Sequence, residues 1–584
     1  MASSGNFATW NGVEIPAYLS LSQGNTKVLG NTSTDASGIN LNIGVTSGKW
    51  YVEFYVIITT SNYPYVGLSA GSTSQDFAAS NQGYNGDIRY HTPNSTGMNN
   101  NTGSAGIINR WGTISTTETG VDACSSGDIV GFALDMDNKK LFISRNGTFF
   151  NSGDPANGTN PQASWTTNPE SAFINCFTYT SSRGCVVNAG QDSSFSNNKT
   201  SGSANATDGN GFGDFYYTPP TGFLALCSAN LPTSTDIDPA ETDDDFPQKQ
   251  FNCVTYTGNA STRNITGVGF QPDLVITRGR SDASVCKVVD SSRGATKVLQ
   301  THSTSSESTD SSGLTAFGSD GYTLGSDAGY NNNSTTYVAW CWRANGGTTA
   351  SNSDGDITST VQANTKAGFS IVTYTGDNTD HTGVGYGSAD IGHGLSKAPE
   401  LVISKRRDGT GGWYTYHVGA GIGYVQLDSN ITFQAGGVPF GPNAPTTTTV
   451  GAYSANNNSG HTYLYYCWHS VDGYSKFGSY EGNGNDNGPF IYTGFRPRYF
   501  WLKEIDVADD WVIYDTARDT ANTGSSKVVR FEASGTEYDH SSRAVDIYSN
   551  GFKLRTSNNT INASNSTYIY AAWGDVPFKY NNSF

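Results

Sequence analysis

The sequence feature that most constrains the fold is an internal repeat. The stretch at residues 269–278 contains the box Gly-Phe-x-Pro-Asp-Leu-Val-Ile, and close relatives of it occur at residues 395–405 and 494–503. Each copy follows a Tyr-x-Gly signature and is closed by an aromatic strand that begins with Thr-Tyr and ends with Trp. The signatures start at Tyr256, Tyr374 and Tyr480, and the closing strands occupy residues 336–342, 462–468 and 567–573.

The spacing of the copies predicts tandem domains. The closing tryptophans Trp342, Trp468 and Trp573 are 126 and 105 residues apart (468 − 342 and 573 − 468). These distances exceed the roughly 20 to 50 residues of a solenoid or propeller repeat. An asparagine also recurs six positions before the tyrosine of each closing strand, as Asn331, Asn457 and Asn562. We expect each one to fix a turn by bonding the backbone, and a ligand role is the alternative.

Length and composition indicate an all-β, multidomain chain. At roughly 150 residues per domain, 584 residues give about four domains. Strand-forming and turn residues dominate the composition, with 69 Gly, 33 Tyr and 28 Phe. The predicted domains are a β-sandwich at 1–232, an acidic linker at 233–246, a first repeat at 247–347, a linker at 348–367, a degenerate second repeat at 368–475 and a third repeat at 476–584.

Charge and segment patterns exclude several classes of partner. The formal net charge of −17 repels phosphate backbones and anionic membranes, so no nucleic acid is expected as a partner. No signal-peptide pattern opens the chain, and no apolar run reaches the roughly 18 to 20 residues of a membrane span. We therefore expect a protein that is not exported by a standard signal. The eight cysteines lie far apart without a Cys-x-x-Cys pair, so we favour free thiols over disulfides or zinc.

The first 226 residues show strand signals in a recognisable order. In residues 48–56, the alternate residues Trp50, Val52, Phe54 and Val56 would share one face of a strand, and Lys49, Tyr51, Glu53 and Tyr55 the other. A strand at 127–137 turns at residues 138–140, and Asn146-Gly147 marks a further hairpin. Together with Val66-Gly67-Leu68 and the stretch at 187–191, this order resembles the SPRY family. The resemblance implies a concanavalin-like β-sandwich that binds proteins through loops at one end.

The repeat boxes carry a second resemblance. With the closing strands and the junction at residues 222–232, they resemble a repeat domain of structural proteins of tailed phages, including marine and cyanophage types, that often follows a SPRY-like module. The resemblance implies three antiparallel β-sandwich-like domains and a virion component, such as a tail fibre or tail-associated protein. The resemblance does not identify what is bound. For a virion component we expect other virion proteins as partners, a host-surface receptor for which polysaccharide is one candidate, and assembly in the host cytoplasm.

Catalytic and ligand-binding patterns are sparse. Glycosidases need two carboxylates roughly 5 to 10 Å apart, and the densest candidates are Glu504, Asp506, Asp509 and Asp510. We favour a solvated loop for them, and for the acidic stretch at 236–245 a linker over a calcium loop. Asp290 with Arg293, and Asp515 with Arg518, are expected to pair and fix turns, while the second repeat has His417 near this place.

Loop aromatics are the remaining ligand candidates, because aromatic rings stack on sugar faces. The candidates are Tyr84, Tyr330, Trp413, Tyr414 and Tyr453. Packing or turn roles are the alternative for each of them. We expect no catalytic residues, metal or cofactor. The leading hypothesis is a non-enzymatic virion protein for host recognition, and the alternatives are a capsid decoration or adaptor protein and a polysaccharide-degrading enzyme. We expect a homo-oligomer and take a trimer as its hypothesis, because fibre-type proteins are commonly trimers.

Overall fold

The computed structural model is all-β, as the composition predicts, and forms two compact units. The first comprises Met1–Pro232 and Pro489–Tyr492, which includes β37 (Phe490–Tyr492), and the second comprises Thr233–Gly488 and Thr493–Phe584. The structure describes residues 6–580 except 14, 32–35, 59–63, 71–74, 78–86, 92–105, 110–115, 119–123, 167–170, 179–182, 201–205, 233, 236, 240–241, 243–244, 386, 437–438 and 521. Within these residues, no helix has the length and apolar character to cross a membrane.

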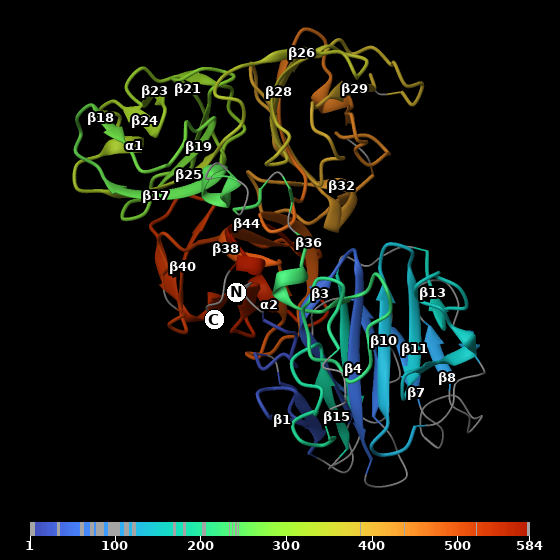
Figure 1. Cartoon of the computed structure of the whole chain (residues 1–584). Coiled ribbons are helices and arrows are strands. Elements are labelled where there is room, and N and C mark those ends of the chain that lie inside the picture. Colours follow the sequence, from blue (N-terminus) through green and yellow to red (C-terminus); the bar gives the residue numbers. More distant parts are fainter. Residues whose placement is uncertain are drawn as a thin grey trace. The chain divides into compact units, whose positions relative to one another are not determined.

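The first unit is a sandwich of two mainly antiparallel sheets (Figure 1). One sheet has the order β1 (Leu19–Ser22), β2 (Lys27–Gly30), β15 (Gly184–Asn188), β4 (Lys49–Ile57), β10 (Ile129–Asp135), β11 (Lys140–Arg145) and β12 (Thr148–Phe149), with β13 (Ala163–Ser164) on β11 and β16 (Leu224–Ala225) on β4. The other has the order β6 (Gln75–Phe77), β3 (Ala36–Val45), β14 (Ala172–Thr178), β5 (Tyr65–Ala70), β7 (Asp87–His91), β8 (Gly106–Asn109) and β9 (Thr116–Glu118).

Both predicted hairpins of this unit are confirmed. β10 pairs with β11 across the turn at residues 138–140, and β11 pairs with β12 across Asn146-Gly147. Both turn residues have positive φ, 49° and 81°, which this tight connection requires and which asparagine and glycine adopt most readily. On β4, Trp50, Val52, Phe54 and Val56 are buried as the alternation predicts. The opposite face is covered too, because Tyr51 and Glu53 are also buried.

The second unit contains the three repeats, each built on one large antiparallel sheet. The first sheet has the order β17 (Phe251–Thr257), β25 (Thr336–Trp342), β19 (Leu274–Gly279), β20 (Lys287–Asp290), β21 (Lys297–Gln300) and β22 (Ser308–Thr309). The second has β26 (Ala350–Asn352), β27 (Ser359–Asn364), β28 (Phe369–Thr375), β35 (Thr462–Trp468), β30 (Leu401–Arg406), β31 (Trp413–His417), β32 (Gly421–Gln426) and β33 (Gln434–Ala435). The third has β36 (Ser475–Glu481), β44 (Thr567–Pro577), β38 (Phe495–Glu504), β39 (Trp511–Asp515), β40 (Ser526–Arg530) and β41 (Tyr538–His540).

Smaller sheets and short helices complete each repeat. The small strands are β18 (Arg263–Ile265), β24 (Gly321–Leu324) and β23 (Leu314–Gly318) in the first repeat, β29 (Ala389–Gly392) and β34 (Thr449–Ala452) in the second, and β43 (Gly551–Leu554) and β42 (Val545–Tyr548) in the third. The α-helices α1 (Ala328–Asn331) and α2 (Asn559–Asn562) and the 3₁₀ turn η6 (Ser454–Asn456) precede the closing strands. Further 3₁₀ turns are η1 (Phe150–Ser152), η2 (Ser228–Asn230), η4 (Pro247–Lys249), η5 (Val418–Ala420), η7 (Ser541–Arg543) and η8 (Phe578–Tyr580).

The register of the large sheets is the same in all three repeats. The closing strand lies between the Tyr-x-Gly strand and the strand of the Gly-Phe-x-Pro box. Leu274 pairs with Trp342, Leu401 with Trp468 and Tyr499 with Trp573. This register makes Trp340, Tyr466 and Ala571 equivalent positions, and likewise Asp290, His417 and Asp515.

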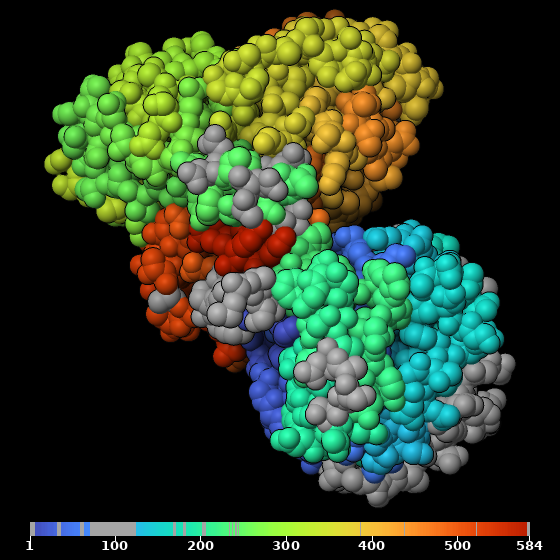
Figure 2. All heavy atoms as spheres, viewed as in Figure 1, coloured from blue at the N-terminus to red at the C-terminus, as the bar shows by residue number. Residues whose placement is uncertain are grey.

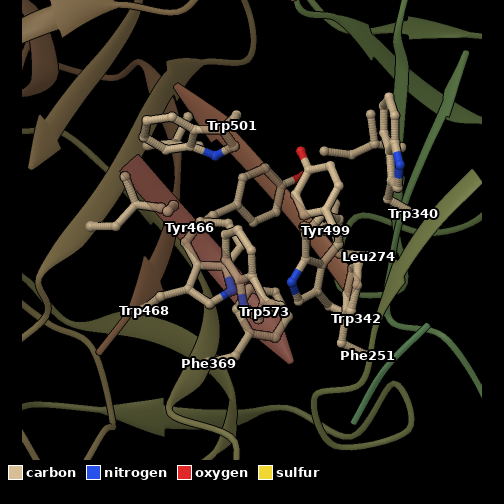
Figure 3. Close-up of a cluster of buried hydrophobic side chains, with 14 of the residues drawn as sticks. Phe251, Leu274, Trp340, Trp342, Phe369, Tyr466, Trp468, Tyr499, Trp501 and Trp573 are labelled. Atoms are coloured by element: carbon tan, nitrogen blue, oxygen red, sulfur yellow. The ribbon is translucent and has the colours of Figure 1, made fainter. Parts of the chain in front are cut away.

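The three large sheets enclose one common core. Trp342, Trp468 and Trp573 meet in its middle, with ring centroids 6.1, 5.4 and 5.9 Å apart, and Figure 3 shows them with Phe251, Phe369 and Tyr499 around them. Alternation along each closing strand sends one set of residues to this core and the other set to a core inside the repeat. The repeats therefore form one domain around a pseudo-threefold axis, seen as three lobes in Figure 1.

The two segments predicted as linkers belong to this unit instead. Residues 348–367 contain β26 and β27, which extend the second large sheet. In the acidic stretch, Ile237 is fully buried in the common core, and Asp245 forms an ion pair with Lys366 at 3.3 Å. Pattern reading missed these roles because charge and glycine content masked single buried residues.

Candidate functional site

The recurring asparagine fixes the same turn in each repeat, which confirms its predicted role. The side-chain oxygens of Asn331, Asn457 and Asn562 accept from backbone N–H groups of residues 259, 377 and 483 at 2.8–2.9 Å. Their amide nitrogens donate to carbonyls on both sides, for example from Asn331 to Ser261 and Gly325. All three asparagines are fully buried, so each joins the loop after the Tyr-x-Gly strand to the turn before the closing strand.

The Tyr-x-Gly signature belongs to the same structure. The rings of Tyr256, Tyr374 and Tyr480 stack on the leading tyrosines of the closing strands, with centroids 5.2, 5.3 and 4.9 Å apart. Their hydroxyls donate to backbone carbonyls of the turn at 2.8 Å. The glycine two residues later lies against the turn backbone: a Cβ at Gly258 would lie 2.1 Å from the Asn332 carbonyl oxygen. The signature therefore encodes a close backbone approach.

The predicted Asp–Arg pairs form, and they also join neighbouring repeats. Arg293 binds Asp290 at 2.5 Å and Arg518 binds Asp515 at 2.5 Å, and all four side chains are buried. Asp290 also accepts a hydrogen bond from the Tyr466 hydroxyl of the second repeat at 2.6 Å. At the equivalent place, Asp515 accepts from the indole nitrogen of Trp340 of the first repeat at 3.0 Å. Sequence reasoning found the pair and missed its partner, which lies more than 170 residues away.

A second set of ion pairs flanks the first at these two interfaces. Glu307 of the first repeat binds Arg293 and also Arg407 of the second, at 3.0 and 3.1 Å. At the interface between the first and third repeats, Glu537 receives Arg280 at 2.9 Å and Arg518 at 3.3 Å. The backbone pairs at the same residues, since Glu307 donates to the Arg407 carbonyl and Glu537 to that of Arg280.

The interface between the second and third repeats has the same backbone geometry with different side chains. Phe433 donates its N–H to the Ile505 carbonyl at 2.9 Å, in place of the Glu–Arg pairs. His417 replaces the aspartate, and the residue opposite is Ala571 instead of a donor. The His417 Nε2 lies 3.0 Å from the Tyr570 carbonyl oxygen, and its Nδ1 accepts from the Gly419 N–H at 3.0 Å. Burial lowers the pKa of His417 to about 4.

Buried cations and tryptophans also form hydrogen bonds from each repeat to the next around the common core. Lys405 donates to the Thr304 carbonyl and Arg278 to those of Ala533 and Gly535, each across an interface at 2.9 Å. The indole of Trp413 donates to the Gln300 carbonyl, and that of Trp511 to the Gln426 carbonyl, at 2.9 Å. Burial lowers the pKa of Lys405 to about 8. Each repeat thus binds one neighbour with its box strand and the other with its hairpin, which closes a ring.

Three of the four carboxylates considered as the densest glycosidase candidates have structural partners. Asp506 accepts from the Thr567 N–H at 2.7 Å, Asp509 accepts from the N–H of Asp510, and Asp510 pairs with Arg530 at 2.8 Å. Glu504 is fully buried, and burial raises its pKa. The solvated-loop prediction is therefore incorrect for Glu504, because its strand β38 carries it into the interior.

Sequence reasoning missed Glu532, whose pKa burial raises to about 7. Glu532 accepts from the Trp511 N–H at 3.3 Å, and the equivalent Asp428 accepts from the Trp413 N–H at 2.8 Å. Because the second repeat makes the same bond with an aspartate, the position stabilises a hairpin. The signal available in the sequence was this recurrence, hidden by the insertions in the second repeat.

Most of the aromatic residues suggested as sugar contacts are interior. Tyr330, Trp413 and Tyr453 retain 1, 1 and 4% exposure, and Tyr414 is half-buried against Tyr424. Their loops fold back onto the sheets, which removes the first three from a surface role. Tyr84 lies outside the described residues. All eight cysteines are buried free thiols, as favoured from the sequence. In the described part of the chain, no cluster of His, Cys, Asp and Glu is arranged to hold a metal.

The first unit holds a buried carboxylate on the outer face of β4. Glu53 accepts from the backbone N–H groups of Tyr216 and Tyr217 at 2.9 and 2.8 Å, and from the Asn188 amide and the Tyr51 hydroxyl at 3.2 Å. Burial raises the pKa of Glu53 to about 7, although these donors favour its charged form. Glu53 therefore ties the segment after β15 to the sheet.

The ring defines the second unit as an all-β domain made of three intramolecular repeats. The chain belongs to the family described as "Domain of unknown function (DUF7483)", which matches residues 246–577. The match spans all three repeats as one domain, in agreement with their common core. None of the curated proteins compared with the chain matches it.

Solved structures similar to the chain are SPRY domains. The SPRY domain of human HERC1 shares 18% identity over 29% of this chain and 89% of that chain, with a TM-score of 0.21. The PSpry domain of TRIM65 shares 12% identity over 31% and 92%, with a TM-score of 0.22. A further human SPRY domain shares 12% identity over 29% and 94%, with a TM-score of 0.21.

Proposed function

We propose that the protein is a non-enzymatic structural component of a phage virion, a tail fibre or tail-associated protein that contributes to host-surface recognition. The observation that carries the proposal is the closed ring of three repeats around Trp342, Trp468 and Trp573. The interfaces between its repeats consist of buried aromatic contacts and ion pairs, so the ring is suited to act as a rigid scaffold for exposed loops. The likeness of the repeat boxes to virion proteins supplies the biological setting.

The ring also bears on assembly. One chain provides the three-lobed arrangement that fibre proteins commonly obtain from three chains. The trimer hypothesis therefore concerns the assembly of three chains, each of which already contains a ring of three repeats. Sedimentation of the purified protein tests it, because a trimer has three times the 62.1 kDa mass of the chain.

Immunogold labelling of intact particles that carry this gene, with an antibody to the purified chain, tests the main proposal. We expect label at fibre or tail tips. Label over the head would replace the proposal with the capsid decoration or adaptor alternative, and unlabelled particles would contradict a virion role. Release of sugar from host polysaccharide by the purified protein would instead support the enzyme alternative.

A further inference from the structure

One part of the outer face of the first unit combines half-buried aromatic rings with phenol hydroxyl groups. In Figure 2 the segment that follows β15, coloured turquoise to green, spreads over this face of the unit. Phe215, Phe223 and Ala225 of the segment are buried over Tyr51. Tyr55, Tyr216 and Tyr217 stay half-buried beside this covered region. These three residues are called the tyrosine surface below.

The rings of the tyrosine surface are in contact through a buried phenylalanine. The ring of Phe195 lies 5.9 Å from that of Tyr55 and 6.3 Å from that of Tyr216, measured between centroids. Tyr216 and Tyr217 meet edge to face at 5.0 Å. The Tyr217 ring lies over Gly147, where an added Cβ would come within 2.7 Å of it. Three separate chain segments therefore converge on one aromatic surface.

The hydroxyl groups distinguish these tyrosines from those of the repeats. Tyr256, Tyr374 and Tyr480 each donate to a backbone carbonyl. Among the residues that the structure describes, no hydrogen-bond partner is found for the hydroxyls of Tyr55, Tyr216 and Tyr217. A phenol can both donate and accept a hydrogen bond, so each of these hydroxyls can pair with a polar group of a ligand.

The tyrosine surface is held in place from below. Glu53 accepts from the backbone N–H groups of both Tyr216 and Tyr217, and it is fully buried. The turn that carries Phe195 is fixed by Asp192, which accepts from the N–H groups of Ser194 and Ser196 at 2.8 and 2.6 Å. A backbone held in this way loses little freedom on binding, which favours affinity.

Polar groups of both kinds border the rings. The Lys199 ammonium lies 5.8 Å from the centre of the Tyr216 ring. Asp128 and Asn146 lie at the turn beneath Tyr217, where Asn146 donates to Asp128 at 2.8 Å, and Asn146 is exposed. The border therefore offers an ammonium donor and a carboxylate acceptor within the same site.

We propose that the tyrosine surface binds a neutral saccharide of the host surface, which extends the function proposed above and rests on it. Sugar rings present C–H faces that pack on aromatic rings, and their hydroxyls pair with phenol, carboxylate and ammonium groups. A neutral saccharide fits better than an acidic one, because Asp128 borders the site and the chain carries a net charge of −17. Lys199 donates to the ring oxygen or hydroxyls of the bound sugar.

The test uses the full chain and an array of neutral oligosaccharides built from hexoses and N-acetylhexosamines, followed by titration calorimetry with those that bind. We expect the double variant Y216A/Y217A to bind about tenfold more weakly or worse, because it loses the stacking rings. Y216F/Y217F keeps the rings and should bind about threefold to tenfold more weakly, because it loses only hydrogen bonds. Tyr18→Ala, another half-buried tyrosine, which lies just before β1, is the matched control and should bind normally.

The inference is overturned by no binding to the array, or by binding that Y216A/Y217A and Y216F/Y217F leave unchanged. If Y216A/Y217A does not fold, the phenylalanine variant alone decides. A protein partner would appear as host-cell binding that depends on the tyrosine surface but not on these oligosaccharides, which also contradicts the inference. Immunogold label at tail tips with no array binding would reject the sugar site and leave the virion role standing.

Discussion

The second repeat faces its two neighbours with different chemistry on a common backbone. Towards the first repeat it contributes Tyr466 and Arg407 to a network of buried charges. Towards the third it contributes His417 and Phe433, which contact backbone carbonyls. The backbone N–H bond that Glu307, Glu537 and Phe433 each donate to a neighbouring repeat is nevertheless the same. The backbone contacts therefore determine how the repeats form the ring, and the side chains on the two sides of an interface differ together.

The matching is visible at one position of the closing strand. Trp340 and Tyr466 carry hydrogen-bond donors, and they face Asp515 and Asp290, respectively. Ala571 of the third repeat has no side-chain donor, and it faces His417 of the second repeat. A buried aspartate opposite alanine would be left without part of its hydrogen bonding, which costs roughly 1 to 3 kcal/mol. Neutral histidine avoids this cost, because it can reach the backbone carbonyl instead.

The largest loss of stability is expected for Asp515→Asn, at a charged interface. Arg518 would remain fully buried with Glu537 as its one remaining carboxylate partner among the described residues, and breaking a buried ion pair from one side costs about 3 to 5 kcal/mol. We expect Asp290→Asn to have an effect of the same size at the other charged interface. Urea unfolding followed by tryptophan fluorescence measures both, and a loss under about 1 kcal/mol in either variant would show that the pair contributes little.

Acid should instead act on the histidine interface. The folded pKa of His417 is about 4 against 6.5 for the free side chain, so the unfolded state binds the proton first as the pH falls. This contribution to stability is complete above pH 6.5 and is lost progressively towards pH 4, by about 3 kcal/mol at most. Protonation would place a charge in the interface and set an N–H of Nδ1 against the Gly419 N–H.

The measurement is the difference in unfolding free energy between wild type and His417→Gln from pH 7 to pH 4.5. The difference removes the opposite trend of Glu53 and Glu532, whose raised pKa values of about 7 make the folded state bind protons first as the pH falls to 4.5. Parallel pH curves for the two proteins would contradict the assignment. An Asp515→Asn background should leave the difference unchanged, because it lies in another interface.

The dependence of stability on salt concentration should distinguish the outer ion pairs from the apolar contact at the equivalent place. Arg280→Met removes a partly buried bidentate pair with Glu537, and we expect a loss of about 1 kcal/mol at low salt that shrinks at 1 M salt. Ile505→Val at the equivalent place should lose about 0.5 to 1.5 kcal/mol at every salt concentration. Equal salt dependence of the two variants would mean that long-range charge, not the local pair, is responsible.

The sequence predicted what depends on local spacing. Asn331, the Asp290–Arg293 pair and the Asn146-Gly147 hairpin could be predicted because each acts within its own segment or recurs at a fixed offset. The common core could not be predicted, because Trp342 and Trp573 meet across the whole second unit. A tryptophan buried inside one repeat and one buried between repeats have the same sequence pattern.

The same limit explains the candidate site. Tyr216 and Tyr217 carry no motif, and what places them beside Tyr55 is a carboxylate 163 and 164 residues earlier in the chain. The alternation of β4 places Glu53 on the face opposite Trp50, and the sequence pattern does not show that this face is covered. Aromatic composition favours loop residues such as Tyr453 as ligand contacts, although this residue lies in the interior of the second repeat.

The smallest predicted effect concerns what the three repeats share. Tyr256→Phe, Tyr374→Phe and Tyr480→Phe each remove one hydroxyl bond to the turn before the closing strand while keeping the stacked ring. We expect equal losses of about 0.5 to 1.5 kcal/mol, since the bond length is 2.8 Å in every repeat. Urea unfolding of the three variants checks this. A loss confined to Tyr374→Phe would mean that the second repeat also differs from the others in its turn. Equal losses assign the differences between repeats to the interfaces, where His417 and Phe433 replace the charged pairs.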